Sequence, residues 1–356
     1  MENRCASMGK YRIAVIPGDG IGPEVVDAAM KVLDAVQDVV KGLTLETVMV
    51  EAGLRCIPKY GTNLPEHSIQ ILKESHACLK GPVTTPEEPG SPRSAAVTIR
   101  RMFDLYANVR PCRSLPNVPC LKPNIDLVIV RENTEDLYSG IEFELTPGVA
   151  VALRVITWRA CERIVRFAFN LAMKRRKQLA YVHKGNIMKV TDGIFKKAVR
   201  EVAKEFPDVE LWELRVDAAA MQLIKRPEAF DVLVTTNMFG DILSDEAAQL
   251  VGGLGFAAGA NIGDDYGMFE PVHGSAPKYT GMNKVNPIAT ITASKMMLEW
   301  LGSRYRDEAC LKASERIENA ILEVLKEGRV RTYDFGGSST TSEMGEAIAK
   351  KVVELG

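Results

Sequence analysis

The chain has 356 residues, a length typical of about two domains. Its 46% hydrophobic and 26% charged residues exclude a disordered or collagen-like chain. The 45 Lys and Arg residues nearly balance the 46 Asp and Glu residues, and the formal net charge of -1 leaves no overall field for nucleic acid or an anionic membrane. Any anion that the protein binds must therefore be held by a local cluster of cations.

Three absences in the sequence narrow the setting further. No run approaches the roughly 20 apolar residues of a membrane span, and residues 1–10 lack the apolar stretch of a secretory signal. The seven Cys residues are widely spread, and none forms the C-x-x-C pair that would suggest structural zinc. Scattered thiols of this kind are typical of a reducing compartment, so we expect a cytoplasmic protein.

Apolar runs of strand length alternate with helical segments along most of the chain. The run 11–16 is followed by a glycine-rich turn and by a helical pattern over residues 23–40. Two of three further apolar runs also precede helical segments, and this alternation predicts an α/β protein with a largely parallel sheet. The further strands are 127–130, 179–183 and 232–235, and the further helices are 187–206, 239–251, 298–301, 317–324 and 344–353.

Three other segments have features of their own. Residues 81–92 contain four prolines and predict a rigid loop before a helix that starts near Arg93. Residues 141–156 alternate apolar and polar side chains around a Pro-Gly pair, which is typical of a β-hairpin, and such a hairpin suits a dimer arm. The basic run 174–177 closes a helix and is predicted to be a solvated face.

Two glycine-containing turns are candidates for contact with a cofactor. Residues 18–22 (GDGIG) follow the first strand, but their spacing differs from the G-x-G-x-x-G of dinucleotide sites. A tight strand-to-helix turn explains them equally well, so we do not place a Rossmann pyrophosphate site there. Residues 273–277 (HGSAP) form a small-residue turn where a cofactor can approach the backbone closely, with a plain loop as the alternative.

Three arginines are candidates for binding a substrate with several carboxylates. Arg100 falls in a helical segment. Arg110 precedes a proline at a strand end, and Arg131 ends the apolar strand 127–130. Strand C-termini commonly face the ligand crevice of α/β sheets, and guanidinium groups bind carboxylates in bidentate pairs. Spacing alone leaves three unrelated surface arginines as the alternative.

Two further groups suggest metal and acid–base chemistry. Asp241 and Asp245 are four residues apart in a helical segment and therefore share one face. Their oxygens suit Mg²⁺ or Mn²⁺, and acids near a helix N-terminus also complement its dipole. Lys184, after a strand, and Tyr138, in a polar loop, are candidate proton-transfer groups. Read singly, each is more often a surface lysine or an anchored tyrosine.

Several long motifs occur in the order found in one enzyme family. Together they resemble the β-decarboxylating dehydrogenases, which act on isocitrate, homoisocitrate, 3-isopropylmalate and tartrate or malate. The resemblance covers nearly the whole chain. The motifs are residues 16–22 (IPGDGIG), 104–111 (DLYANVRP), 131–138 (RENTEDLY), 237–245 (NMFGDILSD) and 342–348 (SEMGEAI).

The resemblance implies a two-domain α/β fold of the isocitrate/isopropylmalate dehydrogenase type, which differs from the Rossmann fold. A large cofactor-binding domain would comprise residues 1–109 and 261–356. A small dimerisation and metal-binding domain would comprise residues 110–260, with a hairpin arm at 139–156. The protein would be a homodimer or higher homo-oligomer with shared active sites, and neither nucleic acid nor a membrane would be a partner.

The resemblance also implies a reaction: a hydroxy di- or tricarboxylate is oxidised by NAD or NADP and then loses CO₂, with Mg²⁺ or Mn²⁺ bound. The acid Asp217 and the proton acceptor Lys184 would come from the partner subunit. The implied substrate-binding positions are Ser94, Arg100, Arg110, Arg131 and Asn186; the metal ligands are Asp217, Asp241 and Asp245; the proton-transfer pair is Tyr138 and Lys184; and the cofactor-binding positions are Thr84, His273, Gly274, Ser275, Ala276, Lys278, Tyr279, Asn286 and Tyr333.

The choice between NADP and NAD depends on the residues after the HGSAP turn. Family members that use NAD usually carry an acid there, whereas this chain has Lys278 and Tyr279, like NADP-dependent isocitrate dehydrogenases. A cation at that place suits the 2′-phosphate of NADP, and Tyr333 also matches the NADP group. Gly337 stands where that group has an arginine and is typical of NAD users. The resemblance therefore favours NADP over NAD.

The choice of substrate depends on the residues before Arg100. Isocitrate enzymes have Ser and Asn there, isopropylmalate enzymes have leucines, and homoisocitrate enzymes often have an arginine. Ser94 matches the serine, while Ala96 occupies the asparagine position and leaves room for a longer substrate. We expect isocitrate, with homoisocitrate or 3-isopropylmalate as alternatives. A catalytically silent regulatory subunit is a further alternative. Such subunits usually lose part of the proton-transfer and metal set, whereas this chain keeps all of those positions.

Overall fold

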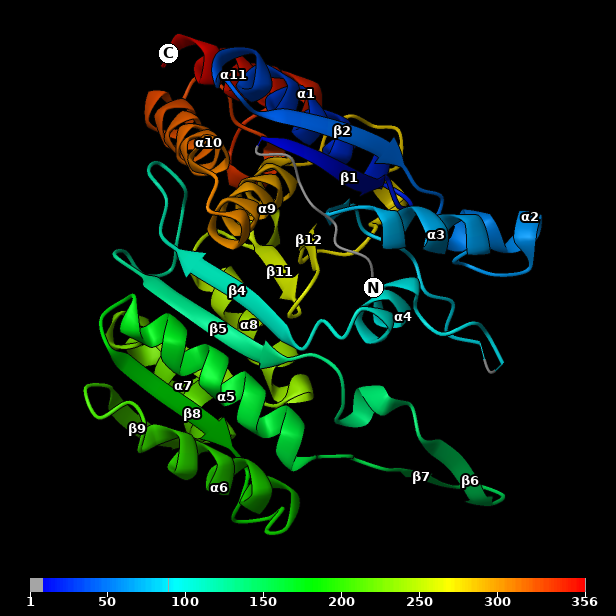
Figure 1. Cartoon of the computed structure of the whole chain (residues 1–356), viewed down its shortest axis with the longest axis vertical. Coiled ribbons are helices and arrows are strands. Elements are labelled where there is room, and N and C mark those ends of the chain that lie inside the picture. Colours follow the sequence, from blue (N-terminus) through cyan, green and yellow to red (C-terminus); the bar gives the residue numbers. More distant parts are fainter. Residues whose placement is uncertain (1–8, 89, 356) are drawn as a thin grey trace.

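The computed structural model describes residues 9–88 and 90–355, so most of the segment considered for a secretory signal, and Pro89 of the proline-rich loop, lie outside the described residues. Ten of the described strands form one sheet, in the order β2-β1-β3-β12-β11-β4-β5-β10-β8-β9 (Figure 1). The strands are β1 Lys10–Ile16, β2 Thr44–Met49, β3 Ala77–Lys80, β4 Ala107–Arg113, β5 Asp126–Glu132, β6 Glu142–Thr146, β7 Val149–Ala152, β8 Gln178–His183, β9 Glu210–Arg215, β10 Val232–Thr235, β11 Ala258–Ile262 and β12 Gly267–Pro271. The α-helices are α1 Gly22–Val39, α2 Ile57–Tyr60, α3 Glu66–Glu74, α4 Ala95–Met102, α5 Trp158–Met173, α6 Thr191–Ala203, α7 Val216–Lys225, α8 Asn237–Leu250, α9 Ile288–Tyr305, α10 Glu308–Glu327 and α11 Thr341–Glu354.

This sheet confirms the predicted α/β class and its mostly parallel character. Strands β2, β1, β3 and β12 pair in parallel, and so do β5, β10, β8 and β9. Between these two groups the pairings β12–β11, β11–β4 and β4–β5 are antiparallel. The antiparallel centre lies outside the βα units that the sequence pattern indicates, because β4, β11 and β12 are not each followed by a crossover helix to a parallel neighbour.

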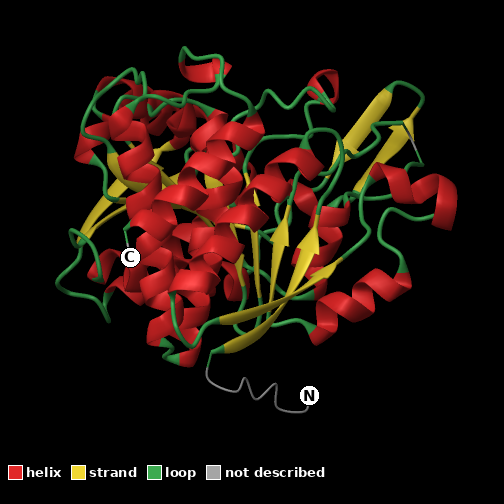
Figure 2. Ribbon diagram, turned by 90° about the horizontal axis from the view of Figure 1, so that it is seen from above, coloured by secondary structure: helices red, strands yellow, loops and turns green. Residues whose placement is uncertain are grey.

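The central strands are apolar on both faces, as expected for strands covered by helices on both sides. In β5, Val128 and Val130 pack in a cluster with α5 and α6, while Leu127 and Ile129 pack in another with α7 and α8. This division follows from the two-residue period of a strand. Figure 2 shows the helices gathered around the twisted strands.

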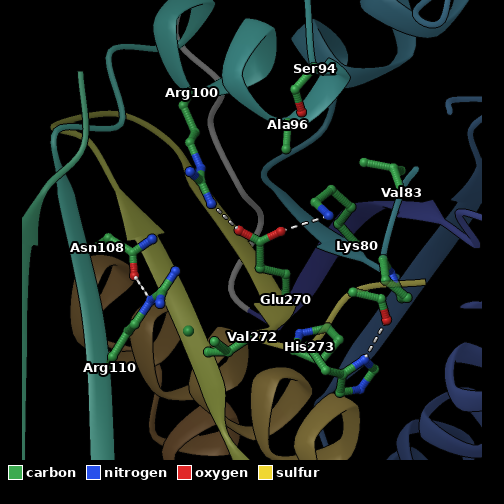
Figure 3. A pocket seen from close by; sticks show the side chains of 14 residues that line it. Lys80, Val83, Ser94, Ala96, Arg100, Asn108, Arg110, Glu270, Val272 and His273 are labelled. Carbon is green, nitrogen blue, oxygen red and sulfur yellow. Dashed lines mark hydrogen bonds and ion pairs between the residues drawn. The ribbon is translucent and has the colours of Figure 1, made fainter. Parts of the chain in front are cut away.

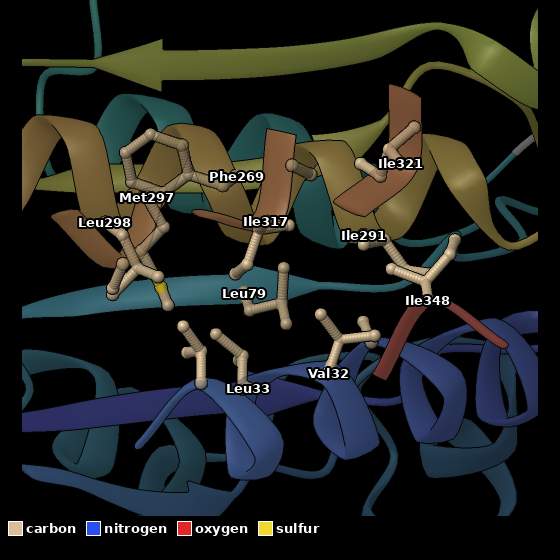
Figure 4. Packing of buried hydrophobic residues seen from close by; sticks show 14 of the residues in the cluster. Val32, Leu33, Leu79, Phe269, Ile291, Met297, Leu298, Ile317, Ile321 and Ile348 are labelled. Atoms are coloured by element: carbon tan, nitrogen blue, oxygen red, sulfur yellow. The ribbon is translucent and has the colours of Figure 1, made fainter. Parts of the chain in front are cut away.

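A second large core joins the two ends of the chain. Val32 of α1 and Leu79 of β3 lie in one apolar cluster with Phe269 of β12, Ile317 of α10 and Ile348 of α11 (Figure 4). Segments more than 250 residues apart in sequence therefore share one buried layer. The predicted helices in the C-terminal third correspond to α9, α10 and α11.

The predicted hairpin is confirmed, and its two strands extend away from the rest of the molecule (Figure 1). Strands β6 and β7 pair with each other in a separate two-stranded sheet. Several of its apolar side chains face solvent in the single chain, including Phe143 and Leu145. Such exposed apolar groups suit an interface with another chain.

The structure corrects three local predictions. Helix α6 begins at Thr191 rather than 187, because the backbone N–H groups of Ile187 and Met188 turn back to the carbonyl of Lys184. Arg110 lies inside β4 rather than at a strand end, because the antiparallel pairing with β5 continues past the proline. The run 174–177 is not simply solvated, since Arg175 donates to a buried aspartate, Asp231, at 2.7 Å.

Two further observations concern the helices and the thiols. None of the helices in the described part of the chain is long and apolar enough to cross a membrane. Six of the seven cysteines fall among the described residues, and all six are free thiols. Burial raises the pKa of the Cys112 thiol to about 12, which makes it unreactive at neutral pH.

Candidate active site

Two strands and one helix bring two of the predicted arginines to the predicted acids. Arg131 lies near the end of β5, Arg110 lies on its neighbour β4, and both reach α8. The Arg110 guanidinium donates to Asp245 at 3.1 Å and lies 3.3 Å from Asp241, which Arg131 also contacts. Helix α8 follows β10, the parallel neighbour of β5, so its first turns lie at the same sheet edge. The two acids therefore face arginines.

Burial and charge act in opposite directions on this cluster. Arg131 is only 1% exposed, and burial together with Arg110 lowers its pKa to about 10. Burial would raise the pKa of Asp241, but Arg131 and Arg110 outweigh it and hold that pKa below its usual value. At Asp245 burial prevails over Arg110, so the pKa is raised. The two acids thus differ in their readiness to ionise, although they share one helical face.

Tyr138 joins the same cluster from a short 3₁₀ turn, Leu137–Ser139. Its hydroxyl donates to Asp241, and the guanidinium carbon of Arg131 lies 4.9 Å from the centre of its ring. Burial raises the pKa of Tyr138, so the phenol is protonated at neutral pH. The predicted phenol, one predicted metal ligand and one predicted substrate arginine therefore meet within a single chain.

Lys184 and Asp217 form a separate pair. The Lys184 ammonium lies 2.9 Å from the Asp217 carboxylate, and Asn186 lies exposed in the same loop as Lys184. Across residues 9–88 and 90–355, no three His, Cys, Asp or Glu side chains come close enough to hold one metal ion. Asp241 and Asp245 are partly exposed and offer carboxylate oxygens of the kind that a divalent cation prefers, and Asp241 is held in place by Arg131 and Tyr138. The family pattern implies that Asp217 of a second chain supplies a third carboxylate.

The third arginine, Arg100, lines a neighbouring cavity of about 170 Å³ (Figure 3). Its guanidinium donates to Glu270 at 2.7 Å, and Lys80 lies 2.6 Å from the other oxygen of that carboxylate. Ser94 and Ala96 lie at the start of α4 on the wall of the same cavity. Other lining residues are Pro82, Val83, Asn108, Arg110, Gly259, Pro271, Val272, His273 and Gly274.

Glu270 is a site residue that the sequence patterns do not reveal. It is almost fully buried, and although burial opposes ionisation, Lys80 and Arg100 hold its pKa far below the usual value. Asn261 donates to it at 2.8 Å and accepts from Asn108, which itself accepts from Arg110. A buried hydrogen-bonded chain therefore connects Arg100 with Arg110. The available sequence signal is one charged residue in each of two otherwise apolar strands, Lys80 in β3 and Glu270 in β12.

The predicted cofactor residues of the HGSAP turn lie beside the cavity. Thr84 and Ser275 share a hydrogen bond of 2.6 Å between their hydroxyls. The Nε2 atom of His273 is buried and has no partner, so a polar group of a bound molecule can satisfy it. Ala276 adopts a left-handed backbone, and the exposed Gly274 has open space beside it. These features fit a nicotinamide cofactor lying along the turn.

A cluster of cations and rings follows this turn. The centres of the Tyr279 and Tyr333 rings are 5.6 Å apart, and the Lys278 ammonium lies 4.8 Å from Tyr279. The Lys284 ammonium lies 4.7 Å from the centre of the Tyr333 ring, and this lysine is not among the predicted cofactor residues. A Cβ at Gly337 would lie 2.1 Å from the backbone oxygen of Arg331, so no side chain fits there. The loop therefore excludes an arginine at that place and offers two lysines instead.

The remaining cofactor position supports the same wall. Asn286 is buried and donates to Asp334, the residue next to Tyr333, at 3.0 Å. Its Oδ1 accepts from the backbone of Ile288 at the start of α9. Asn286 therefore joins the loop that carries Tyr333 to the first turn of a core helix.

The chain is similar to known proteins over nearly its whole length. The family described as isocitrate/isopropylmalate dehydrogenase matches residues 12–348. The chain belongs to this family. A 3-isopropylmalate/3-methylmalate dehydrogenase of Methanocaldococcus jannaschii is 46% identical over 349 residues, covering 97% of this chain and 99% of that protein. An NADP isocitrate dehydrogenase of Thermus thermophilus is 48% identical over 351 residues, covering 97% and 68%.

A solved structure agrees with the isocitrate/isopropylmalate dehydrogenase assignment. The crystal structure of isocitrate dehydrogenase from Methylococcus capsulatus matches with a TM-score of 0.89 and 45% identity, covering 96% of this chain and 99% of that one. The predicted family and fold are therefore confirmed. The protein is an oxidoreductase of a family whose members use NAD or NADP and a divalent metal.

Proposed function

We propose that the protein oxidises isocitrate to 2-oxoglutarate and CO₂, with NADP favoured over NAD and with Mg²⁺ or Mn²⁺. The observation that carries this choice is the cavity wall, which contains both the Ser94 hydroxyl and the Arg100 guanidinium and no leucine among its lining residues. A hydroxyl and a guanidinium suit a third carboxylate, while Val83 and Val272 on the same wall keep 3-isopropylmalate as an alternative. The family relatives divide among isocitrate, homoisocitrate and isopropylmalate enzymes, so they support any of the three acids.

The chain's own residues have distinct tasks in this reaction. Arg100, Arg110 and Arg131 bind and orient the carboxylates of the substrate. Lys184 accepts the proton of the 2-hydroxyl, and Tyr138 returns a proton to carbon 3 after CO₂ has left. Asp241 and Asp245 would hold the divalent cation, which when bound polarises the oxygen on carbon 2. The loop 273–277 would hold the nicotinamide, which supplies the hydride acceptor.

The proposal includes the assembly of the site. Because Lys184 and Asp217 form their own pair, we assign them to the active site of a second copy, in a homodimer whose arm is the β6–β7 hairpin. The proposal keeps the domain division at residues 109/110 and 260/261, supported by the fact that most of one apolar cluster comes from the two chain ends and most of another comes from the middle of the chain. We also propose that the protein works in the cytoplasm.

A comparison of three acids tests the substrate. We expect kcat/KM with Mn²⁺ and NADP to be highest for isocitrate, lower for homoisocitrate and lowest for 3-isopropylmalate. A higher kcat/KM for 3-isopropylmalate would contradict the proposal. Homoisocitrate as the best substrate would show that the space beside Ala96 decides the choice.

One alternative belongs to another class, a catalytically silent subunit of a hetero-oligomer. It requires loss of part of the proton-transfer or metal set, and all five positions carry the expected residues in this chain. Reduction of NADP or NAD by the purified homomeric protein would exclude this alternative. Turnover that appears only after a second, different chain is added would support it.

A further inference from the structure

Arg154, just after the second strand of the hairpin, joins two buried carboxylates. Its Nε donates to Asp136 at 2.7 Å, and one terminal nitrogen donates to Asp192. Its other terminal nitrogen donates to the Thr236 hydroxyl at 2.8 Å. Both aspartates are fully buried, and only 11% of the Arg154 side chain is exposed. Buried charges of this kind are tolerated only where their hydrogen bonds are satisfied, as they are here.

The first of these carboxylates shapes the turn that carries Tyr138. Asp136 has a φ of 71°, in the left-handed region that non-glycine residues rarely adopt. Its side chain accepts from the backbone of Leu137 at 2.9 Å and from that of Met238, in the first turn of α8, at 3.2 Å. A strained residue persists only where its surroundings fix it. The place of the Tyr138 turn against α8 therefore depends on where Asp136 is held.

The second carboxylate shapes the loop that carries Lys184. Asp192 lies in the first turn of α6. The carboxylate oxygen that Arg154 does not contact accepts from the backbone N–H of Lys184. Arg154 also donates to the hydroxyl of Thr191, next to Asp192, at 3.1 Å. The Lys184 backbone and the start of α6 are thus tied to the same guanidinium as the Tyr138 turn.

We propose that Arg154 is a positioning residue that sets the Tyr138 turn and the Lys184 loop together. This inference rests on the proposed function, which gives those two groups the proton transfers. Since that function assigns the two groups of one chain to different active sites, one buried ion cluster would align the proton donor of one site and the proton acceptor of the other. A planar guanidinium can bridge both aspartates at once, whereas a lysine ammonium, a single point of charge, cannot.

The variant Arg154→Lys tests the proposal in the full-length protein. Hydrogen–deuterium exchange by mass spectrometry should show faster exchange in peptides covering both residues 134–140 and 183–190, without any substrate present. With Mn²⁺ and the preferred acid, kcat should fall about tenfold to 100-fold while both KM values stay within about threefold, because small misplacement of reacting groups slows chemistry more than binding.

Arg175→Lys is the matched control. Arg175 also joins two aspartates, Asp126 at 2.9 Å and the buried Asp231 at 2.7 Å, and these lie at the start of β5 and before β10, the opposite end of the strands. Its loss should lower the melting temperature and leave exchange in both loops and kcat unchanged. An equal fall of kcat in Arg175→Lys would overturn the proposal, because general loosening would then explain the effect.

A second variant covers the case in which Arg154→Lys does not fold. Asp192→Asn keeps an acceptor for the Lys184 N–H but removes one charge from Arg154, so exchange should rise in 183–190 and less in 134–140. Unchanged exchange in both loops, in whichever variant folds, would overturn the proposal. A wild-type protein that oxidises none of the three acids would overturn the proposed function instead, and the exchange result would still stand.

Discussion

The arginine cluster and the Lys184 loop differ in how much of their surroundings one chain supplies. Arg110 and Arg131 are nearly buried and are already paired with acids of α8. Among the described residues, Lys184 forms an ion pair only with Asp217, whose side chain is 62% exposed, and the Lys184 loop presents Ile187 and Val190 to solvent. The difference teaches that the arginines proposed to bind substrate have their partners within one chain, whereas the proposed proton acceptor lies in an exposed loop that suits contact with a second chain.

The largest effect is expected from a substitution in the exposed Lys184 loop. Lys184→Met should lower kcat about 10²- to 10⁴-fold, because a general base contributes that much, while the KM for the acid changes little. Steady-state kinetics with Mn²⁺ and NADP measures both constants. Lys204→Met, at an exposed lysine that pairs with Glu201 at 2.6 Å, is the control and should behave as the wild type. A kcat within threefold of the wild type for Lys184→Met would remove Lys184 from the chemistry.

The next largest effect is expected from a substitution in the buried arginine cluster. Arg110→Gln should lower kcat/KM about tenfold to 100-fold, mainly through KM, because a charged hydrogen bond to a carboxylate contributes about 1.5–3 kcal/mol. Arg113→Gln is the control on the same strand, since the ion pair of Arg113 is with Glu318 of α10, at 2.8 Å, and not with the acids of α8. Equal losses in both variants would show that strand β4, not the guanidinium, matters.

A smaller effect concerns the cofactor cluster, which is exposed like the Lys184 loop. Lys278→Asp should shift the ratio of kcat/KM for NADP and NAD towards NAD by about tenfold or more, because a negative charge repels the 2′-phosphate. Lys284→Met should shift the ratio in the same direction by less, if both lysines replace the excluded arginine. An unchanged ratio in Lys278→Asp would place the 2′-phosphate elsewhere.

The smallest effect concerns stability beside Lys184. Burial opposes ionisation of Glu213, but hydrogen bonds from Lys196 and Tyr181 lower its pKa to about 2. A carboxyl whose pKa is lowered by folding stabilises the fold fully above its usual pKa and loses that contribution as the pH falls towards the lowered value. Glu213→Gln should therefore lower the melting temperature at pH 7 and lower it much less near pH 2.

Thermal unfolding followed by circular dichroism between pH 2 and 7 measures this difference. Glu210→Gln on the same strand is the control, because the exposed Glu210 carboxylate accepts a hydrogen bond from the indole N–H of Trp212 and forms no ion pair in the described residues. A difference between Glu213→Gln and the wild type that does not change with pH would contradict the assigned cause.

The sequence predicts those parts of the fold and site that rest on local pattern or on motifs. The hairpin, the strand–helix alternation and the common face of Asp241 and Asp245 follow from periods of two and 3.6 residues. Glu270 and Lys80 are not predictable in this way, because their pairing joins residues 190 positions apart within apolar strands. Arg154 is equally hidden, since its role comes from two loops that only the tertiary fold brings together.

The most direct test of the shared site mixes two inactive variants, Tyr138→Phe and Lys184→Met, by joint unfolding and refolding. If each site takes Tyr138 from one chain and Lys184 from the other, half of the dimers are mixed and each mixed dimer has one intact site of two. We therefore expect about a quarter of the wild-type rate of isocitrate-dependent NADPH formation with Mn²⁺, on random pairing of a two-fold dimer. No recovery above the separate variants would contradict a site built from two copies of this chain.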